Sequence, residues 1–462
     1  MKNEDDASWK NRTEGSRQFF KKACNVIPGG VSANIKFFPP YPIVMKNGSG
    51  SKLIDVDGNE YIDYLLCYGA LITGHGHPRI MEAVEKHFRL IGTTILGTPH
   101  ELEITMAEKM IQLYPGIDMV RFTNSGLEAA LLAIRMATAY TSKEKIAKFE
   151  GHYHGGFNHV LVSVNPDKKL AGAKVQPNAV PESKGITKRE LDNTIVLPFN
   201  DLEATETLLR NHAEQLAAVI IEPVQGGFIP ADKEFMIGLR KITKELNILL
   251  IFDEVKTGFR AALGGAQSVY GVHPDLTALG KVLGGGYPIG AVGGQKDIMM
   301  ISAPKLHSDI FSIGEKSAAT NDVVFHSGTY NGHPMVLAAG LEAIYLLEEA
   351  NTMNEITLQT NKLRTGLEKM YKSYGIQMQT VGMGSIFNII FTDKPIRNYR
   401  DMWEVDISFR QAIDEELLKL GIYLKPMNRY SLSTVHREED ILKTIAAHEK
   451  ALKIVLQKKQ DH

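Results

Sequence analysis

Two residues in the middle of the chain have types and spacing that could do chemistry together. Asp253 ends the apolar run Ile-Leu-Leu-Ile-Phe, and Lys281 follows in Leu-Gly-Lys-Val-Leu-Gly-Gly-Gly. A buried lysine loses proton affinity and becomes a usable nucleophile and base, able to form a Schiff base with a carbonyl. A carboxylate can hold the proton of an aromatic ring nitrogen. The competing interpretation is that Lys281 is a surface lysine beside a flexible glycine loop.

Two segments pair a hydroxyl side chain with glycine just before a predicted helix. In the first, Ser125 and Gly126 could present a hydroxyl and backbone amides to a phosphate at the helix N-terminus. In the second, Thr329 lies among glycines and precedes a helix that starts near Pro334. Asn and Ser are also ordinary N-cap residues, so a plain helix start explains either segment equally well in isolation.

A glycine-rich loop after the apolar run 145–149 carries Tyr153 between two histidines, His152 and His154. A tyrosine or histidine at this point could lie flat on a planar ring. The alternative is a loop with two unremarkable histidines. The His-x-His pair lacks a third ligand at supporting spacing, so we expect no metal site here.

The elements that must position these residues alternate along the chain. Short apolar runs, read as strands, are separated by helix-length amphipathic segments; the runs are 120–123, 145–149, 194–197, 217–222 and 248–253. This alternation predicts an α/β fold with a mostly parallel sheet and helices on both faces. Ligands of such sheets bind outside the carboxyl ends of the strands, which is where the residues above lie.

We expect three segments in the chain. Residues 1–75 and 331–462 would contribute to a smaller α+β domain, and residues 76–330 would form the large domain. The last segment has helical patterns at 353–374 and 438–457 around an apolar run at 385–391. Residues 303–325 read as an insertion that could form a lid or a wall of a pocket.

Composition excludes several classes of protein. The 462 residues are 44% hydrophobic and 23% charged with a formal net charge of −1, so neither nucleic acid nor an anionic membrane is an expected partner. Residues 1–12 are polar and acidic, unlike a secretory signal, and no apolar run is long enough for a membrane span. Two cysteines form no disulfide framework, and a cytoplasmic location is expected.

Taken in order, these motifs resemble those of the class III pyridoxal-phosphate (PLP) aminotransferases, and within that family the glutamate-1-semialdehyde 2,1-aminomutase branch. The motifs are Asn124-Ser125-Gly126, Tyr153-His154-Gly155, Asp253-Glu254-Val255, Leu279-Gly280-Lys281 and Gly328-Thr329. The resemblance implies PLP as cofactor and the PLP-dependent transferase fold type I, with a large domain built on a mostly parallel seven-stranded sheet and a smaller domain made from both termini. It also implies a homodimer with the active site at the interface.

The resemblance assigns roles to the cofactor residues. Lys281 would carry the cofactor as a Schiff base, and Asp253 would pair with the pyridine nitrogen. Ser125 and Gly126 would bind the phosphate, and Thr329 would reach the phosphate of the neighbouring subunit. The remaining cofactor residues are Tyr153, stacked on one ring face, Val255 on the other, and His154 and Glu222 close to the cofactor.

Departures from the family pattern concern the substrate. Lys36 stands where the aminomutase has a carboxylate-binding arginine, and lysine cannot form the planar bidentate fork. Tyr68 stands in place of a tryptophan. Arg429 could be the carboxylate clamp instead, or else a surface arginine after a strand. Lys256 stands where relatives have glutamine or methionine, and its effect does not follow from the sequence.

The function predicted from this resemblance is transfer of an amino group between an amino acid or amine and a keto acid or aldehyde, through the Lys281 Schiff base. Two alternatives stay open: the aminomutase of tetrapyrrole biosynthesis, and a β-amino acid transaminase. Segment 165–190 partly resembles the aminomutase gating loop, and this resemblance supports the first alternative. A non-enzymatic relative of the fold is disfavoured because Lys281 and Asp253 are both present.

Overall fold

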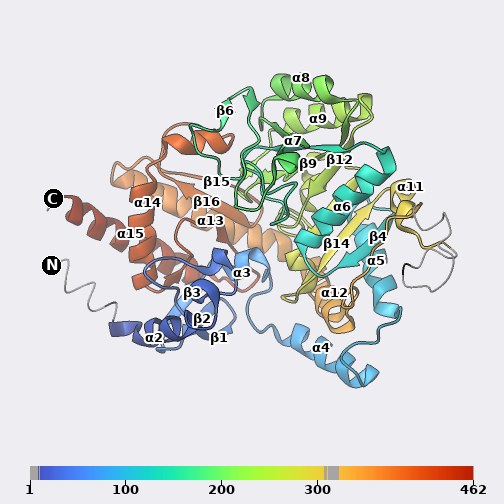
Figure 1. The fold of residues 1–462 in the computed structure, drawn as a ribbon. Coiled ribbons are helices and arrows are strands. Elements are labelled where there is room, and N and C mark those ends of the chain that lie inside the picture. Colours follow the sequence, from blue (N-terminus) through green and yellow to red (C-terminus); the bar gives the residue numbers. More distant parts are fainter. Residues whose placement is uncertain (1–8, 10, 306–309, 311–321, 461–462) are drawn as a thin grey trace.

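The apolar runs in the middle of the chain form one seven-stranded sheet in the order β4-β14-β13-β12-β9-β5-β8 (Figure 1). The computed structural model describes residues 9, 11–305, 310 and 322–460, so most of the expected insertion at 303–325 lies outside the described residues. The strands are β4 (Met119–Thr123), β5 (Lys145–Phe149), β8 (Thr194–Leu197), β9 (Leu216–Ile221), β12 (Leu249–Asp253), β13 (Leu276–Gly280) and β14 (Gly290–Gly294).

The predicted mostly parallel sheet is confirmed. β12 pairs in parallel with β9 and β13, and β5 pairs in parallel with β8 and β9. Only β14 of this sheet runs antiparallel to its neighbours, β13 and β4. The other strands therefore end at the same edge, and Ser125, Glu150, Glu222, Asp253 and Lys281 lie at or just beyond those ends.

Strand β14 is absent from the sequence prediction because its sequence, Gly-Ala-Val-Gly-Gly, is poor in strand-forming residues. The structure shows why glycine stands there. A Cβ at Gly290 would lie 2.1 Å from the carbonyl oxygen of Ser125, and one at Gly293 would lie 2.4 Å from Ile117. The strand is thus glycine-rich because other segments of the same chain, at Ser125 and Ile117, approach it closely.

Helices cover both faces of the sheet. On one face, small residues of α6 (Gly126–Thr141) such as Ala129 and Ala133 pack with Ile220 and Ile251 of the sheet. On the other, α8 (Leu202–His212) and α9 (Lys233–Glu245) bury Leu209 and Phe235. Figure 1 shows α6 in front of the strands and α8 and α9 above them. Further helices of this part are α4 (Pro78–Ile91), α5 (Glu101–Leu113), α7 (Lys188–Asp192), α10 (Gly265–Tyr270) and α11 (Lys296–Met299).

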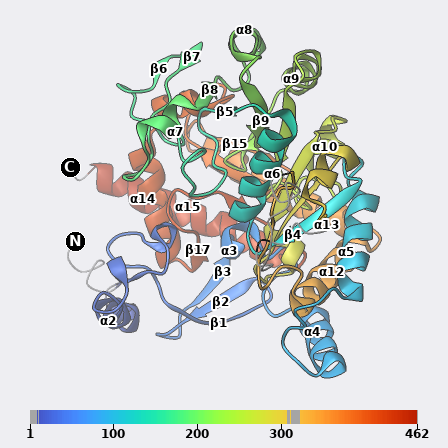
Figure 2. The ribbon, with the colours of Figure 1, turned by 45° about the vertical axis from the view of Figure 1, so that its right-hand side comes forward.

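The beginning and the end of the chain meet in a second, smaller sheet. Its order is β1-β2-β3-β17, with β1 (Met45–Ser49), β2 (Lys52–Asp55) and β3 (Glu60–Asp63) from the first segment and β17 (Ile422–Tyr423) from the last. α2 (Glu14–Ala23) and α15 (Glu438–Gln460) lie on the same side of the molecule in both ribbon views (Figure 2). This pairing supports a small domain built from both termini, while the boundaries at 75/76 and 330/331 stay a prediction.

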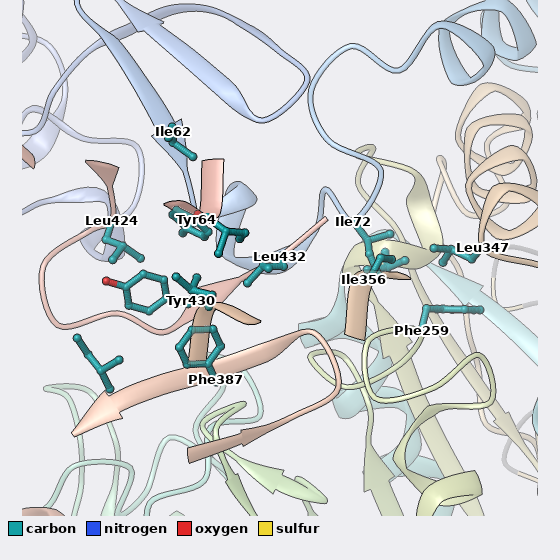
Figure 3. Close-up of a cluster of buried hydrophobic side chains, with 14 of the residues drawn as sticks. Ile62, Tyr64, Ile72, Phe259, Leu347, Ile356, Phe387, Leu424, Tyr430 and Leu432 are labelled. Atoms are coloured by element: carbon teal, nitrogen blue, oxygen red, sulfur yellow. The ribbon is translucent and has the colours of Figure 1, made fainter. Parts of the chain in front are cut away.

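The C-terminal part adds a three-stranded sheet and four helices. The strands are β15 (Gln379–Met383), β16 (Ile386–Ile390) and β18 (Tyr430–Ser431), and the helices are α12 (Pro334–Glu348), α13 (Thr352–Ser373), α14 (Ile407–Lys419) and α15. One hydrophobic cluster joins this part to the rest. Figure 3 shows Ile62 and Tyr64 of the first segment beside Tyr430 and Leu432 of the last. In the described part of the chain, no helix is both long and apolar enough to span a membrane.

Candidate active site

A cavity of about 300 Å³ lies at the carboxyl ends of β4, β12 and β13. Seven of the residues predicted from the sequence line it together: Ser125, Gly126, Tyr153, His154, Asp253, Val255 and Lys281. These residues are far apart in the sequence and converge because parallel strands deliver their following residues to one edge.

Lys281 is held at the start of a short 3-10 turn, η3 (Lys281–Gly284), immediately after β13. Its φ of +50° is in the left-handed region, which is uncommon for a residue with a side chain and often occurs at functional sites. Within the described residues its amine has no hydrogen-bond or ion-pair partner. Burial, followed by the positive charges of Lys256 and Arg429, lowers the pKa of Lys281 to about 7. The amine is therefore substantially unprotonated near neutral pH.

Asp253 forms a buried pair with His154. The Nδ1 of His154 lies 2.7 Å from the Oδ2 of Asp253, and the backbone N–H of Val255 donates to Oδ1 at 3.1 Å. Burial raises the pKa of Asp253, but the hydrogen bond and charge of His154 outweigh burial and leave this pKa below its ordinary value. Asp253 is thus an ionised carboxylate inside the cavity, able to stabilise a protonated ring nitrogen.

Ser125 caps helix α6. Its hydroxyl accepts a hydrogen bond from the backbone N–H of Glu128 at 3.2 Å, while the Glu128 carboxylate accepts from the N–H of Asn124 at 2.7 Å. The N-cap interpretation is therefore correct, and it is compatible with anion binding because the cavity opens onto the same helix N-terminus. Gly126 is required for packing, since a Cβ there would lie 2.6 Å from Val255.

Glu222 connects the Tyr153 loop to Lys256. Its Oε2 accepts from the backbone N–H of Tyr153 at 2.9 Å, and its Oε1 forms an ion pair with Lys256. The Lys256 ammonium lies 5.4 Å from the centroid of the Tyr153 ring, within the range of a cation–π contact. The side chain of Tyr153 is 44% exposed, so its ring is available to a ligand in the cavity.

The three predicted substrate residues lie apart from the residues that line this cavity. Arg429 donates from Nη2 to the carbonyl of Tyr68 at 2.9 Å, and the Tyr68 hydroxyl donates to the carbonyl of Ile35 at 2.8 Å. Tyr68 has a φ of +57° within the short helix α3 (Leu66–Gly69). Lys36 is exposed and bonds to the hydroxyl of Ser32. Arg429 is thus not a simple surface arginine, and Lys36 does not reach the cavity wall.

Thr329 lies in a different cavity, of about 850 Å³, together with Ile104 and Ile111 of α5. The two cavities are neighbours, since the side chain of Asn124 donates to that of Asn331 at 3.0 Å. Within one chain, the structure therefore does not bring Thr329 to Lys281.

Sequence reasoning missed several residues of the Lys281 cavity. Tyr287 and Pro288 line it directly after the three glycines, and Leu127 lines it beside Gly126. Lys256, which the sequence singled out without a role, lines it too, and its ion pair with Glu222 could not be predicted. The sequence signal that could have identified these residues was their position alone, because each of them comes one or two places after a motif residue. Among the described residues, no group of three or more His, Cys, Asp or Glu side chains could hold a metal ion.

Comparisons with known proteins agree with this geometry. The family model for aminotransferase class-III matches residues 37–452. The glutamate-1-semialdehyde 2,1-aminomutase of Ignicoccus hospitalis is 41% identical over 447 residues, covering 95% of this chain and 99% of the relative. An omega-transaminase from Sphaerobacter thermophilus superposes with a TM-score of 0.88 at 36% identity, covering 95% and 97% of the two chains. A β-phenylalanine aminotransferase from Variovorax paradoxus gives 0.82 at 31% identity, covering 97% and 95%.

Proposed function

Because the chain belongs to the class-III aminotransferase family, we propose that it is a PLP-dependent enzyme that moves an amino group from an amino acid or amine to a keto acid or aldehyde. The observation that carries this proposal is the arrangement of the cavity. An amine with lowered proton affinity, Lys281, and an ionised carboxylate, Asp253, line the same space. A non-enzymatic relative would not need to maintain both.

The cavity fits PLP in three respects. Lys281 offers to an aldehyde an amine that has no partner in the described ranges, and Asp253, oriented by His154, offers a carboxylate to a ring nitrogen. Ser125 and Gly126 at the N-terminus of α6 would hold the phosphate. Tyr153 and Val255 would lie on the two ring faces, with Glu222 close by. When bound, the cofactor supplies an electron-withdrawing ring that stabilises negative charge at the substrate Cα.

The residues of the chain would divide the remaining work. Lys281 Nζ, whose pKa is lowered to about 7, would accept the proton from the substrate Cα and return it, as a general base and acid. Asp253 would hold the proton at the ring nitrogen, and His154 would keep the carboxylate in place. Glu222 would fix the loop that carries Tyr153 through the backbone N–H of that residue.

We propose Arg429 as the clamp for a substrate carboxylate. The guanidinium is largely enclosed, and its Nε has no hydrogen-bond partner within the described part of the chain. Its positive charge lowers the pKa of Lys281. A planar guanidinium can bind a carboxylate through two parallel hydrogen bonds. Tyr68, whose carbonyl accepts from Arg429, would then form part of the same substrate wall, while exposed Lys36 would assist from outside.

A screen of amine donors and carbonyl acceptors tests the proposed reaction. The protein is loaded with PLP and offered pairs of amino acids and keto acids, and the amino product is measured. Transfer that depends on both partners and is abolished in Lys281→Ala supports the proposal. Normal transfer by Lys281→Ala would refute it.

A second candidate is the glutamate-1-semialdehyde 2,1-aminomutase reaction, which is favoured by the 41% identity to the Ignicoccus hospitalis enzyme over nearly its whole length. Conversion of glutamate-1-semialdehyde to 5-aminolevulinate without added donor or acceptor would select it. A β-amino acid transaminase is the third reading, supported by the likeness to the Variovorax paradoxus aminotransferase. β-Phenylalanine as amine donor in the same screen addresses that reading.

We also propose that the enzyme is a homodimer with an active site at the interface. Thr329 lies outside the Lys281 cavity of its own chain and would bind the phosphate in the partner subunit. Ile104 and Ile111, which line the Thr329 cavity, are exposed apolar residues that a second copy would cover. A cytoplasmic location is proposed as well, supported by the two free cysteines, Cys24 and Cys67.

A further inference from the structure

Every oxygen of the Glu222 carboxylate is engaged. Oε1 forms the ion pair with Lys256, and Oε2 accepts from the backbone N–H groups of Tyr153 at 2.9 Å and Gly226 at 3.2 Å. The two ion-paired side chains are shielded from solvent, with Glu222 2% and Lys256 13% exposed. A shielded carboxylate that is already paired with a cation has little to gain from a second one.

Arg429 is a near neighbour of this carboxylate but does not pair with it. The turn formed by Gly226 and Gly227 contacts both residues: the N–H of Gly226 bonds to Glu222, and a Cβ on Gly227 would lie 2.8 Å from Nε of Arg429. The charge of Glu222 raises the proton affinity of the guanidinium, although burial lowers the pKa of Arg429. Among the described residues, no carboxylate forms an ion pair with Arg429, whose Nε is buried without a partner.

We propose that Lys256 is a specificity-determining residue: by occupying Glu222, it leaves Arg429 uncompensated and so available to the carboxylate of a substrate. The inference rests on the proposed role of Arg429 as the clamp. It gives a role to the lysine at position 256, which pairs with Glu222 and also contacts the Tyr153 ring. It also names the preferred substrate class, amines and carbonyl compounds that bear a carboxylate.

The other charges around the site act in the same direction. The buried guanidinium of Arg260, which donates to the carbonyl groups of Gly69 and Leu432, is close enough to Arg429 for the two charges to repel. Asp253, the remaining carboxylate that faces Lys281, is engaged by His154. A ligand carboxylate would therefore be the group that neutralises Arg429. Without Lys256, the carboxylate of Glu222 would be the nearest competitor.

Binding of two unreactive probes to the PLP-loaded enzyme tests the inference without measuring turnover. Glutarate carries carboxylates, and glutaramide is its uncharged counterpart; calorimetry gives the dissociation constant of each. We expect the unmodified enzyme to prefer glutarate by about tenfold or more, the effect of one charge-assisted contact. In Lys256→Met, Glu222 is free to turn to Arg429, so the preference for glutarate over glutaramide should fall by about tenfold.

Three further variants separate the possible causes. Lys256→Arg keeps a cation on Glu222 and should retain the preference for glutarate. Lys256→Met combined with Glu222→Gln removes the competitor and should restore it. Glu222→Gln alone leaves Arg429 without a competitor and should bind glutarate at least as tightly as the unmodified enzyme, a result that does not require Lys256→Met to fold.

The clamp and the inference can fail separately. If Arg429→Gln does not change the preference for glutarate over glutaramide, the proposed clamp is wrong, and the role of Lys256 is refuted with it. If Arg429→Gln abolishes the preference but Lys256→Met leaves it intact, the clamp stands and the inference about Lys256 is overturned. A loss of preference in Glu222→Gln would also overturn it.

Discussion

The imidazole Nδ1 of His154 lies 2.7 Å from the carboxylate Oδ2 of Asp253, and both side chains are buried in the wall of the Lys281 cavity. Among the residues that the structure describes, none forms a hydrogen bond with the Nε2 of His154. The interaction therefore serves Asp253: it holds the carboxylate in one orientation and keeps it ionised despite burial.

This relationship predicts a graded effect of two substitutions. Asp253→Asn removes the negative charge that would stabilise the ring proton, and we expect kcat/KM to fall by about 10²-fold or more, as for other preorganised electrostatic contacts. His154→Phe keeps an aromatic ring at the position but removes the hydrogen bond from His154 to Asp253, so a smaller loss is expected. Steady-state kinetics with the best substrate pair measures both. A larger loss in His154→Phe than in Asp253→Asn would contradict the assigned roles.

The proton affinity of Lys281 predicts the pH dependence of cofactor loading. Only the unprotonated amine attacks an aldehyde, and the pKa of Lys281 is lowered to about 7. The rate at which the cofactor-free protein takes up PLP should therefore rise with pH through a midpoint near 7, followed by absorbance in a stopped-flow instrument. A midpoint near the ordinary lysine value would show that the amine is solvated.

The site of attachment needs its own measurement, because Lys148 is a second buried lysine whose pKa burial lowers to about 7. Lys148 donates to the carbonyl of Val162 at 2.5 Å and does not line the cavity. Borohydride reduction followed by peptide mass mapping should find the label on Lys281. A label on Lys148 would refute the assignment.

Packing at the helix N-terminus predicts a stability effect. In Gly126→Ala the new Cβ would lie 2.6 Å from Val255, an overpacking expected to lower the free energy of unfolding by about 1–3 kcal/mol and to weaken PLP binding. Gly156→Ala is the matched control, because its Cβ would meet nothing closer than Leu127 at 4.0 Å. Denaturant unfolding and a PLP titration compare the two. Adding Val255→Ala to Gly126→Ala should recover most of the loss.

The position of Thr329 predicts complementation between subunits. In the proposed homodimer, Lys281→Ala and Thr329→Ala should each impair activity, one by removing the amine and the other by weakening the phosphate site of the partner subunit. Mixed dimers of the two variants would contain one site with both defects and one intact site. After mixing under conditions that exchange subunits, each mixed dimer should therefore have about half the activity of an unmodified dimer, because a C2 dimer has two equivalent sites and one of them is intact. If mixing restores nothing although exchange is demonstrated, Thr329 acts within its own chain.

Much of the site could be predicted because its residues lie directly after strands. Asp253 is the last residue of β12, Lys281 directly follows β13, and Ser125 follows β4 and caps helix α6. An apolar run of strand length followed by a polar residue is visible in the sequence, and parallel strands bring such residues to one edge of the sheet. Strands β13 and β14 are both missing from the predicted runs. For β14 the reason is that its glycines are required by close packing of neighbouring segments, so its sequence lacks strand-forming residues.

The sequence by itself determined the alternating pattern of strands and helices, the family, and the identity of the amine and carboxylate at the ends of β12 and β13. Only the tertiary structure decided which partner each charged side chain binds. Lys256 forms an ion pair with Glu222, His154 bonds to Asp253, and Arg429 donates to the carbonyl of Tyr68. The physical reason is that strand and helix patterns arise from local periodicity. Which cation a buried carboxylate pairs with depends instead on distances between segments that are far apart along the chain.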